Sequence, residues 1–166
     1  MALQRSKLTV IITAMSAYVY GLANSVNSLS KSYISEVTEG TSADQADVVF
    51  HANRSLTAAA SEDLDLSGSL TDPFNATVSL ARVKRLVIRN NSTTGTLTIG
   101  GAASAAWTGP FSSGGTATIG PECVFVCERK DATGYPVTAG TGDKLKILNN
   151  GGTTSTYDIV VVGCSA

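Results

Sequence analysis

From residue 55 onward, short apolar and β-branched runs alternate with turn residues at intervals of about ten residues, as they do in all-β domains. Within several runs apolar and polar residues alternate, which is typical of a half-buried strand. This spacing indicates an antiparallel sandwich or barrel. We therefore predict an all-β fold, an antiparallel β-sandwich of jelly-roll type. The clearest predicted strands are residues 61–66, 81–90, 96–100, 123–128, 144–148 and 157–162.

The connections between these runs argue against a doubly wound α/β fold. Such a fold needs helical segments of about ten or more residues between its strands, whereas these connections are short and rich in Gly and Pro. A turn is predicted at Thr71–Phe74, because Pro73 fixes φ and cannot donate to a ladder. Another is predicted at residues 150–152. Asn and Gly residues between 90 and 95 make a connection of hairpin length, so we expect 81–90 to pair with 96–100.

Residues 1–40 show a different pattern, which fits two kinds of structure. Leu8, Val10 and Ile12 alternate with other residues as in a strand, and the segment is rich in residues that form helices poorly. Further on, apolar residues recur at spacings of three and four, as on an amphipathic helix. We predict a strand followed by a helix or by further strands, forming an N-terminal arm (1–40) before the sandwich (41–166). The helix-like stripe consists of Met15, Tyr18, Leu22, Val26, Leu29, Tyr33 and Val37.

Two short segments allow other interpretations. Basic residues precede the apolar run 8–23, as in a signal peptide. Polar residues dilute that run, however, so we favour a structural element, and it is too short and polar for a membrane-spanning helix. Residues 42–50 (SADQADVVF) begin with Ser and Asp, which can cap a helix. One or two helical turns are predicted there.

The charge balance makes nucleic acid an unlikely partner. The 166 residues include 12 Lys and Arg against 13 Asp and Glu, and only 15% are charged. A protein that neutralises phosphates needs a basic patch, and the only positive cluster lies at Arg82, Lys84, Arg85 and Arg89. Hydroxyl groups replace the missing charges, since the chain has 20 Thr and 19 Ser. We expect wide contact surfaces of low charge.

The cysteines provide neither a disulfide framework nor a zinc site. Cys123, Cys127 and Cys164 are odd in number and form no C-x-x-C pair. Residues four apart on one strand are separated by about 13 Å, so Cys123 and Cys127 cannot bridge within a strand. We expect three buried, reduced thiols.

No arrangement of residues predicts catalysis, a metal or a cofactor. His51 is the only histidine, and no G-x-S-x-G elbow accompanies it. Asp63 and Asp65 have about the spacing of a glycosidase pair, and with Asp72 they could offer oxygens to Ca²⁺. A solvated strand face explains them better, because no D-x-D-x-D-G loop is present. The Gly-rich stretches 100–106 and 139–144 are interpreted as turns, not as phosphate-binding loops.

One aromatic pair offers a possible ligand platform. Trp107 and Phe111 lie beside a Gly-rich loop, and exposed aromatic rings there could stack on sugars. Packing of Trp107 in the core is the favoured alternative. With little material for catalysis, the sequence indicates a protein that acts through surface contact.

Several ordered strings resemble small virion structural proteins of tailed bacteriophages. They cover roughly residues 40–166, and the resemblance rests on their order along the chain. SEDLDL precedes the rest, as similar strings do in that family. The strings are FNATVSLARVKRLVIRNN (74–91), LTIGGAAS (97–104), GPF (109–111), DATGYPVTAGTGDKLKI (131–147) and TYDIVVVG (156–163).

This resemblance implies a setting and a role. Small all-β proteins of this group commonly act as capsid cement or decoration proteins, which sit on the outside of the shell and hold neighbouring major capsid subunits together. The resemblance thus implies a non-enzymatic homo-oligomer, a dimer or a trimer, whose partner is the major capsid protein. The N-terminal arm would bury its apolar residues on a neighbour or on its own domain, and both remain open. The alternative function is a tail, fibre or glycan-binding module for host attachment.

Overall fold

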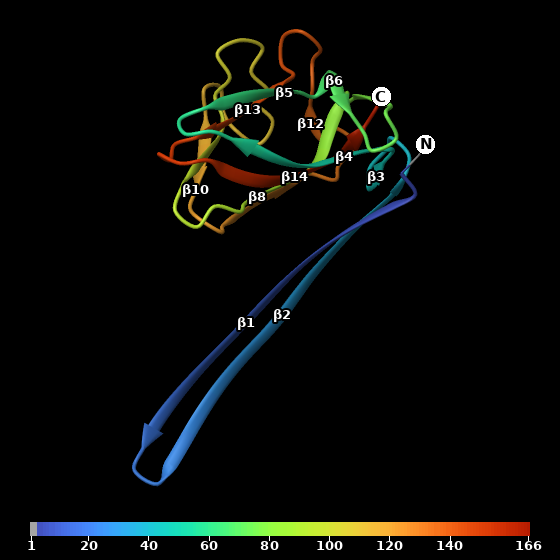
Figure 1. Ribbon diagram of the computed structural model, residues 1–166. Coiled ribbons are helices and arrows are strands. Elements are labelled where there is room, and N and C mark those ends of the chain that lie inside the picture. Colours follow the sequence, from blue (N-terminus) through green and yellow to red (C-terminus); the bar gives the residue numbers. More distant parts are fainter. Residues whose placement is uncertain (1–2) are drawn as a thin grey trace.

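The computed structural model describes residues 3–166, including the side chains of all of these except residues 20, 23 and 24. No α-helix occurs in that range, so no described segment is a helix that could cross a membrane. Figure 1 shows two regions: a domain of packed sheets and a long hairpin that projects from it. The hairpin consists of β1 (Arg5–Tyr20) and β2 (Ala23–Glu39), which we call the arm. A two-residue strand, β3 (Gln45–Ala46), pairs with the domain end of β2.

Two antiparallel sheets form the domain. Sheet 1 has the order β11-β8-β14-β4, and β12 (Tyr135–Pro136) adds to β8 beyond the end of β11. Its other strands are β4 (Val48–Leu56), β8 (Arg82–Asn90), β11 (Val124–Glu128) and β14 (Ser155–Cys164). Sheet 2 has the order β10-β9-β13-β5. Its strands are β5 (Ser61–Asp65), β9 (Leu97–Gly100), β10 (Thr116–Ile119) and β13 (Lys144–Asn149).

A small hairpin closes one end of the domain. β6 (Ser67–Thr71) and β7 (Thr77–Ser79) pair, and the connection at residues 72–76 includes most of the turn predicted at Thr71–Phe74. The Asp72 carboxylate accepts hydrogen bonds from the amides of Phe74 and Ala76, both at 2.9 Å. The local turn chemistry at this position therefore agrees with the sequence prediction.

The core lies between the two sheets. Strand alternation sends every second side chain inward, so β13 buries Leu145 and Ile147 while β14 buries Tyr157, Ile159 and Val161. Side chains from both sheets and from the small hairpin join in one cluster. The predicted all-β sandwich is thus confirmed.

Consecutive strands switch between the sheets. If the eight sandwich strands β4, β5, β8, β9, β10, β11, β13 and β14 are numbered one to eight along the chain, sheet 1 reads 6-3-8-1 and sheet 2 reads 5-4-7-2. Only the fourth and fifth strands, β9 and β10, are consecutive and paired in one sheet. All other consecutive pairs cross from one sheet to the other.

Two sequence predictions are wrong. Residues 42–50 form turns, β3 and the start of β4 instead of a short helix. β8 and β9 do not pair as a hairpin, because β8 lies in sheet 1 and β9 in sheet 2. In residues 1–40 the structure decides between the two alternatives: a strand is followed by a further strand, and the amphipathic stripe is not a helix.

Candidate interaction surface

The arm is a single long antiparallel ladder. Arg5 pairs with Thr38 at its domain end, and the register continues without a bulge to residues 20 and 23. The two strands are joined at Gly21 and Leu22, where Gly21 has a φ of +57°. Two-residue hairpin loops require such a positive φ and favour Gly there. The local sequence therefore makes a tight hairpin between two runs rich in β-branched residues and Ser.

Each face of the arm carries apolar side chains. Residues that pair across an antiparallel ladder share a face, so the register defines two sets. The inner face is the one that continues into the contacts with the domain, and its apolar members are Leu8, Val10, Ile12, Ala14, Tyr18, Leu29, Tyr33 and, at the domain end, Val37. The outer face combines apolar and hydroxyl side chains, among them Thr9, Ile11, Thr13, Met15, Ala17, Val19, Val26, Ser28, Ser30, Ser32 and Ile34.

These apolar side chains remain open to solvent in the single chain. Ile11 is 65% exposed and Met15 76%, while Ile12 on the inner face is 48% exposed. Between Lys7 and Glu36 the sequence contains one charged residue, Lys31. An isolated two-stranded hairpin is marginally stable in water, and an uncharged apolar strand pair is a template for association. The arm therefore has the composition of a buried element, although in the single chain no second layer packs against it.

The root of the arm, where β1 and β2 meet the domain, is held by an apolar cluster. Val37, Ala46 and Val162 are buried together. Leu3, Val49 and Val160 pack against them as partly buried neighbours. Val49 and Val162 are register partners on β4 and β14, so the cluster lies on the outer face of sheet 1, opposite to the sandwich core.

A buried ion pair completes the root. The Arg85 side chain is 3% exposed and pairs with Glu128, whose side chain is 22% exposed. Arg85 Nε donates to Glu128 Oε1 at 3.0 Å, and Nη1 donates to Ser6 Oγ on β1 at 2.6 Å. On β2, Ser35 Oγ donates to the same Glu128 oxygen at 2.7 Å. One arginine and one glutamate thus join both strands of the arm to sheet 1.

Beside the root, the outer face of sheet 1 has a second uncovered apolar surface. Val126, Val87 and Val160 are register neighbours on β11, β8 and β14, and we call them the valine row. Val126 is 39% exposed, and Val124 on the same strand is 53% exposed. Val160 also contacts the root cluster. The valine row and the inner face of the arm therefore start from the same buried cluster.

The predicted positive cluster does not form a surface patch. Lys84 is fully buried, and its ammonium donates to the backbone carbonyls of Asp131 and Ser42. Arg85 is occupied at the root of the arm, whereas Arg89 is exposed. Two of the four basic side chains therefore stabilise the fold.

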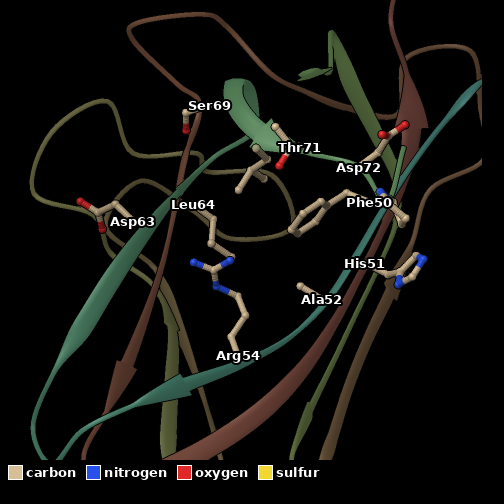
Figure 2. A pocket seen from close by; sticks show the side chains of 11 residues that line it. Phe50, His51, Ala52, Arg54, Asp63, Leu64, Ser69, Thr71 and Asp72 are labelled. Atoms are coloured by element: carbon tan, nitrogen blue, oxygen red, sulfur yellow. The ribbon is translucent and has the colours of Figure 1, made fainter. Parts of the chain in front are cut away.

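A polar pocket of about 390 Å³ lies where β4 and β5 meet the small hairpin (Figure 2). Asp63, Arg54 and Asp72 line it, together with the Phe50 ring. In Figure 2 the His51 side chain points away from Asp63 and Arg54. Strand alternation explains this, because His51 and Arg54 lie on opposite faces of β4. His51 and Asp63 therefore do not form an acid–base pair.

The carboxylates singled out from the sequence separate in the structure. Asp65 pairs with Lys144 at 2.9 Å and accepts from the Ser67 amide at 3.0 Å. Burial raises the pKa of Asp65, but Lys144 and the Ser67 amide outweigh this effect and hold the pKa below its ordinary value. Asp63 is exposed, and Asp72 caps the turn of the small hairpin. Among residues 3–166, no group of three His, Cys, Asp or Glu residues could hold a metal ion.

Glu62 on β5 binds two side chains of sheet 1. Its Oε1 accepts from the Tyr157 hydroxyl at 2.7 Å, and its Oε2 accepts from Arg54 Nε at 2.7 Å. Burial and this hydrogen bond raise the pKa of Tyr157. The three side chains link β4, β5 and β14, so they join the edges of the two sheets.

Trp107 is a core residue. It is 2% exposed, and its Nε1 donates to the Pro136 carbonyl at 2.9 Å. The Tyr135 ring meets it edge to face at a centroid distance of 6.3 Å. Phe111 stacks on Phe125 at 5.8 Å and is partly buried. The favoured prediction of core packing is confirmed for Trp107, which offers no exposed ring for a sugar.

The three thiols are free but differ in exposure. Cys164 is buried, as predicted, and Cys127 is half-buried, where burial raises its thiol pKa to about 11. Cys123 is exposed, so the prediction of burial is wrong there. It precedes β11 and therefore does not share that strand's alternation.

Sequence reasoning missed the residues that hold the root of the arm. Arg85 and Glu128 lie on strands that were predicted, yet nothing in their local patterns links them to Ser6 or Ser35. The arm's tight hairpin had a usable signal, since Gly21-Leu22 separates two runs of strand-forming residues.

The chain matches no protein-family model, no curated protein and no solved structure.

Proposed function

We propose that this protein is a non-enzymatic virion structural protein, a cement or decoration protein on the exterior of a bacteriophage capsid. Its partner is the major capsid protein, and it acts as a homo-oligomer. The observation that carries the proposal is the arm, whose two apolar faces are exposed in the single chain. The resemblance of residues 40–166 to virion proteins supports the setting.

The form of the arm supports a role that spans subunit boundaries. A strand rises about 3.4 Å per residue, so the 16 residues of β1 extend over roughly 54 Å. That length exceeds what the domain needs for its own packing, because only the root is buried. An element of this reach can contact a subunit well beyond the one on which the domain sits.

The strand order supports a jelly-roll assignment within this proposal. A jelly roll is a double sheet of eight strands made from two Greek keys. Sheets ordered 6-3-8-1 and 5-4-7-2 contain the repeated crossing between layers that this architecture requires. Jelly rolls recur in viral capsid proteins, so the topology is compatible with the proposed setting.

Repetition on the shell accounts for how modest contacts become effective. A shell offers many identical sites, and linked binding events strengthen one another without any new contact. A surface of hydroxyl groups with a net charge of −1 avoids strong attraction to other components. Such a surface suits a protein that binds through repeated sites.

Binding of purified shells by a short-arm variant tests the proposal. Residues 9–34 are replaced by Asn-Gly, so that Leu8 and Ser35, which are register partners, are joined by a tight turn. This variant keeps the root residues Ser6, Ser35 and Val37. We expect an unchanged melting temperature of the sandwich and loss of binding in co-sedimentation with shells, at least tenfold in Kd.

Two results would contradict the proposal. One is equal shell binding by the short-arm variant and the full chain. The other is a copy number in purified virions that matches a tail or fibre component instead of the major capsid protein, which would favour the host-attachment alternative. Burial of Trp107 has already removed the aromatic platform on which the glycan-binding form of that alternative rested.

A further inference from the structure

The arm needs a cover on both sides. Its inner and outer faces each carry at least four apolar side chains in register, and these are about half exposed or more. A flat partner surface would bury one face and leave the other in water. Contacts on both faces of the arm are therefore needed to bury these side chains.

The chain itself carries two surfaces of matching chemistry. The valine row on sheet 1 and the inner face of the arm diverge from one buried cluster, formed by Val37, Ala46 and Val162. Figure 1 shows the arm leaving the domain on the side of sheet 1 and extending away from it. The arm and sheet 1 thus form two arms of a V whose inner surfaces are both apolar.

We propose that two copies of this chain interlock, so that the arm of each enters the V of the other. The inner faces of the two arms then pack against one another, and each outer face packs on the partner's valine row. This inference rests on the proposed role of the arm as an intermolecular contact, and it names a second copy as the occupant.

A two-fold axis relates the copies, so each surface is used once by each chain. The order of layers is sheet 1 of one copy, the arm of the second, the arm of the first, and sheet 1 of the second. The inner face of each arm is covered in this arrangement, and the outer face is covered where it crosses the valine row. The rest of the outer face stays available for the shell contact of the proposed function. The association is closed, so no uncovered arm is left to recruit a third copy.

The area approaches that of a standard interface. With strands about 4.8 Å apart and a rise of about 3.4 Å per residue, each face of the arm measures roughly 54 by 10 Å, or about 500 Å². The packed inner faces therefore bury about 500 Å² per copy, and the valine row with the stretch of outer face that it covers brings the total toward the roughly 800 Å² that a standard interface buries on each partner. Obligate homodimer interfaces are also richer in apolar area than other surfaces.

The charge pattern favours a second copy over an acidic or basic partner. The arm between residues 8 and 35 carries only Lys31, whose ammonium lies 5.8 Å from the centroid of the Tyr33 ring on the same face. The valine row itself is uncharged, and the next row on the same face contains the register partners Arg89 and Asp158, which are opposite in charge. Packing of the arm on the valine row therefore gains from apolar burial without requiring the burial of an unpaired charge of sheet 1.

Sedimentation equilibrium of the full chain tests the inference. We expect twice the chain mass of 17.0 kDa. Leu29→Asp on the inner face and Val126→Glu in the valine row should each raise the dimer Kd at least tenfold. Thr118→Glu is the matched control, because it adds one negative charge at an exposed strand position of sheet 2, and it should leave the dimer intact.

Photo-crosslinking locates the contacts within the dimer. A photoreactive phenylalanine at Tyr33 should give a product of twice the chain mass joined arm to arm. The same group at Met15 should join the arm to the partner's sheet 1. Circular dichroism and melting of each variant confirm that the sandwich is folded.

The inference is overturned by a monomer at all concentrations, by a trimer, or by a dimer that survives both Leu29→Asp and Val126→Glu. The proposed function fails separately, by shell binding that does not depend on the arm. A full chain that is a trimer and binds shells through its arm would overturn the interlocked pair and leave the proposed function standing.

Discussion

The arm and the sandwich are built from the same kinds of residue but differ in what faces them. Both contain Val, Ile, Leu and Tyr among Ser and Thr, arranged on antiparallel ladders. In the sandwich, Ile147 faces a second sheet and is fully buried, whereas Ile11 in the arm faces solvent and is 65% exposed. A ladder alone therefore does not make a core; a second layer does.

The difference also shows where this fold derives its stability. Burial of apolar area dominates the free energy of folding, and nearly all buried side chains belong to the sandwich. The arm adds hydrogen bonds along its ladder, but each contributes little net free energy in water. Substitutions in the sandwich, the root and the free part of the arm should therefore have decreasing effects.

The largest effect is expected for Trp107→Ala in the sandwich. The substitution removes a fully packed indole and its hydrogen bond to the Pro136 carbonyl. We expect the free energy of unfolding to fall by about 4 kcal/mol, in the range measured for buried aromatic residues. Urea denaturation followed by circular dichroism provides the measurement. A loss below about 1 kcal/mol would show that Trp107 behaves as a surface residue.

An intermediate effect is expected for Arg85→Ala at the root. Glu128 then keeps a partly buried charge without its partner, and Ser6 loses its guanidinium donor. We expect a loss of about 3 kcal/mol, the lower end for a broken buried pair because Glu128 is partly exposed.

Hydrogen exchange measures the effect on the arm. In Arg85→Ala, exchange in the first residue pairs of the arm should speed up relative to the unsubstituted chain more than exchange at the tip does. Arg82→Ala is the control, since Arg82 lies on the same strand and donates only to the Ala132 carbonyl among the described contacts. Equal effects of the two substitutions would argue against a special role for Arg85.

The smallest effect is expected for Ile11→Ala in the free part of the arm. In dilute solution, where the chains are separate, the sandwich should change in stability by no more than about 0.5 kcal/mol. The same substitution at Ile147 should cost about 2 to 5 kcal/mol. Thermal melts of both variants make the comparison, and a large loss for Ile11→Ala at high dilution would mean that the arm packs on its own domain.

The sequence was sufficient to predict the sandwich because strand alternation is a local property. Residues 81–90, 144–148 and 157–162 were predicted as strands and lie within or close to β8, β13 and β14. Whether β8 pairs with β9 could not be predicted from such a local pattern, and the two strands lie in different sheets. A connection with Asn and Gly at its ends looks alike whether it returns to the same sheet or crosses to the other.

The arm misled the pattern analysis for a physical reason. Apolar residues spaced three and four apart lie on one face of a helix. A strand with apolar residues on both faces can produce the same spacings by chance. Met15, Tyr18 and Leu22 belong to this mixed pattern. The turn at Gly21 was the better guide, because its positive φ ends one strand and starts the next.

The candidate surface was only partly accessible from the sequence. An arm that buries apolar residues against a neighbour or against its own domain was predicted, but the valine row and the root network depend on register. Val87 lies between Val126 and Val160 only because three strands distant in sequence align. Such alignment is a tertiary property and leaves no local signal.

The root network makes the arm a lever. The arm is held only over its first few residue pairs, while its tip lies roughly 54 Å away. A rotation of about 10° at Arg85 and Glu128 would displace the tip by about 9 Å over that length. Under the proposed function, residues near the root would meet a neighbour at a nearly fixed place, whereas the turn at Gly21 would reach over a wide arc. Recognition would begin with a search by the tip and end with registration at the root.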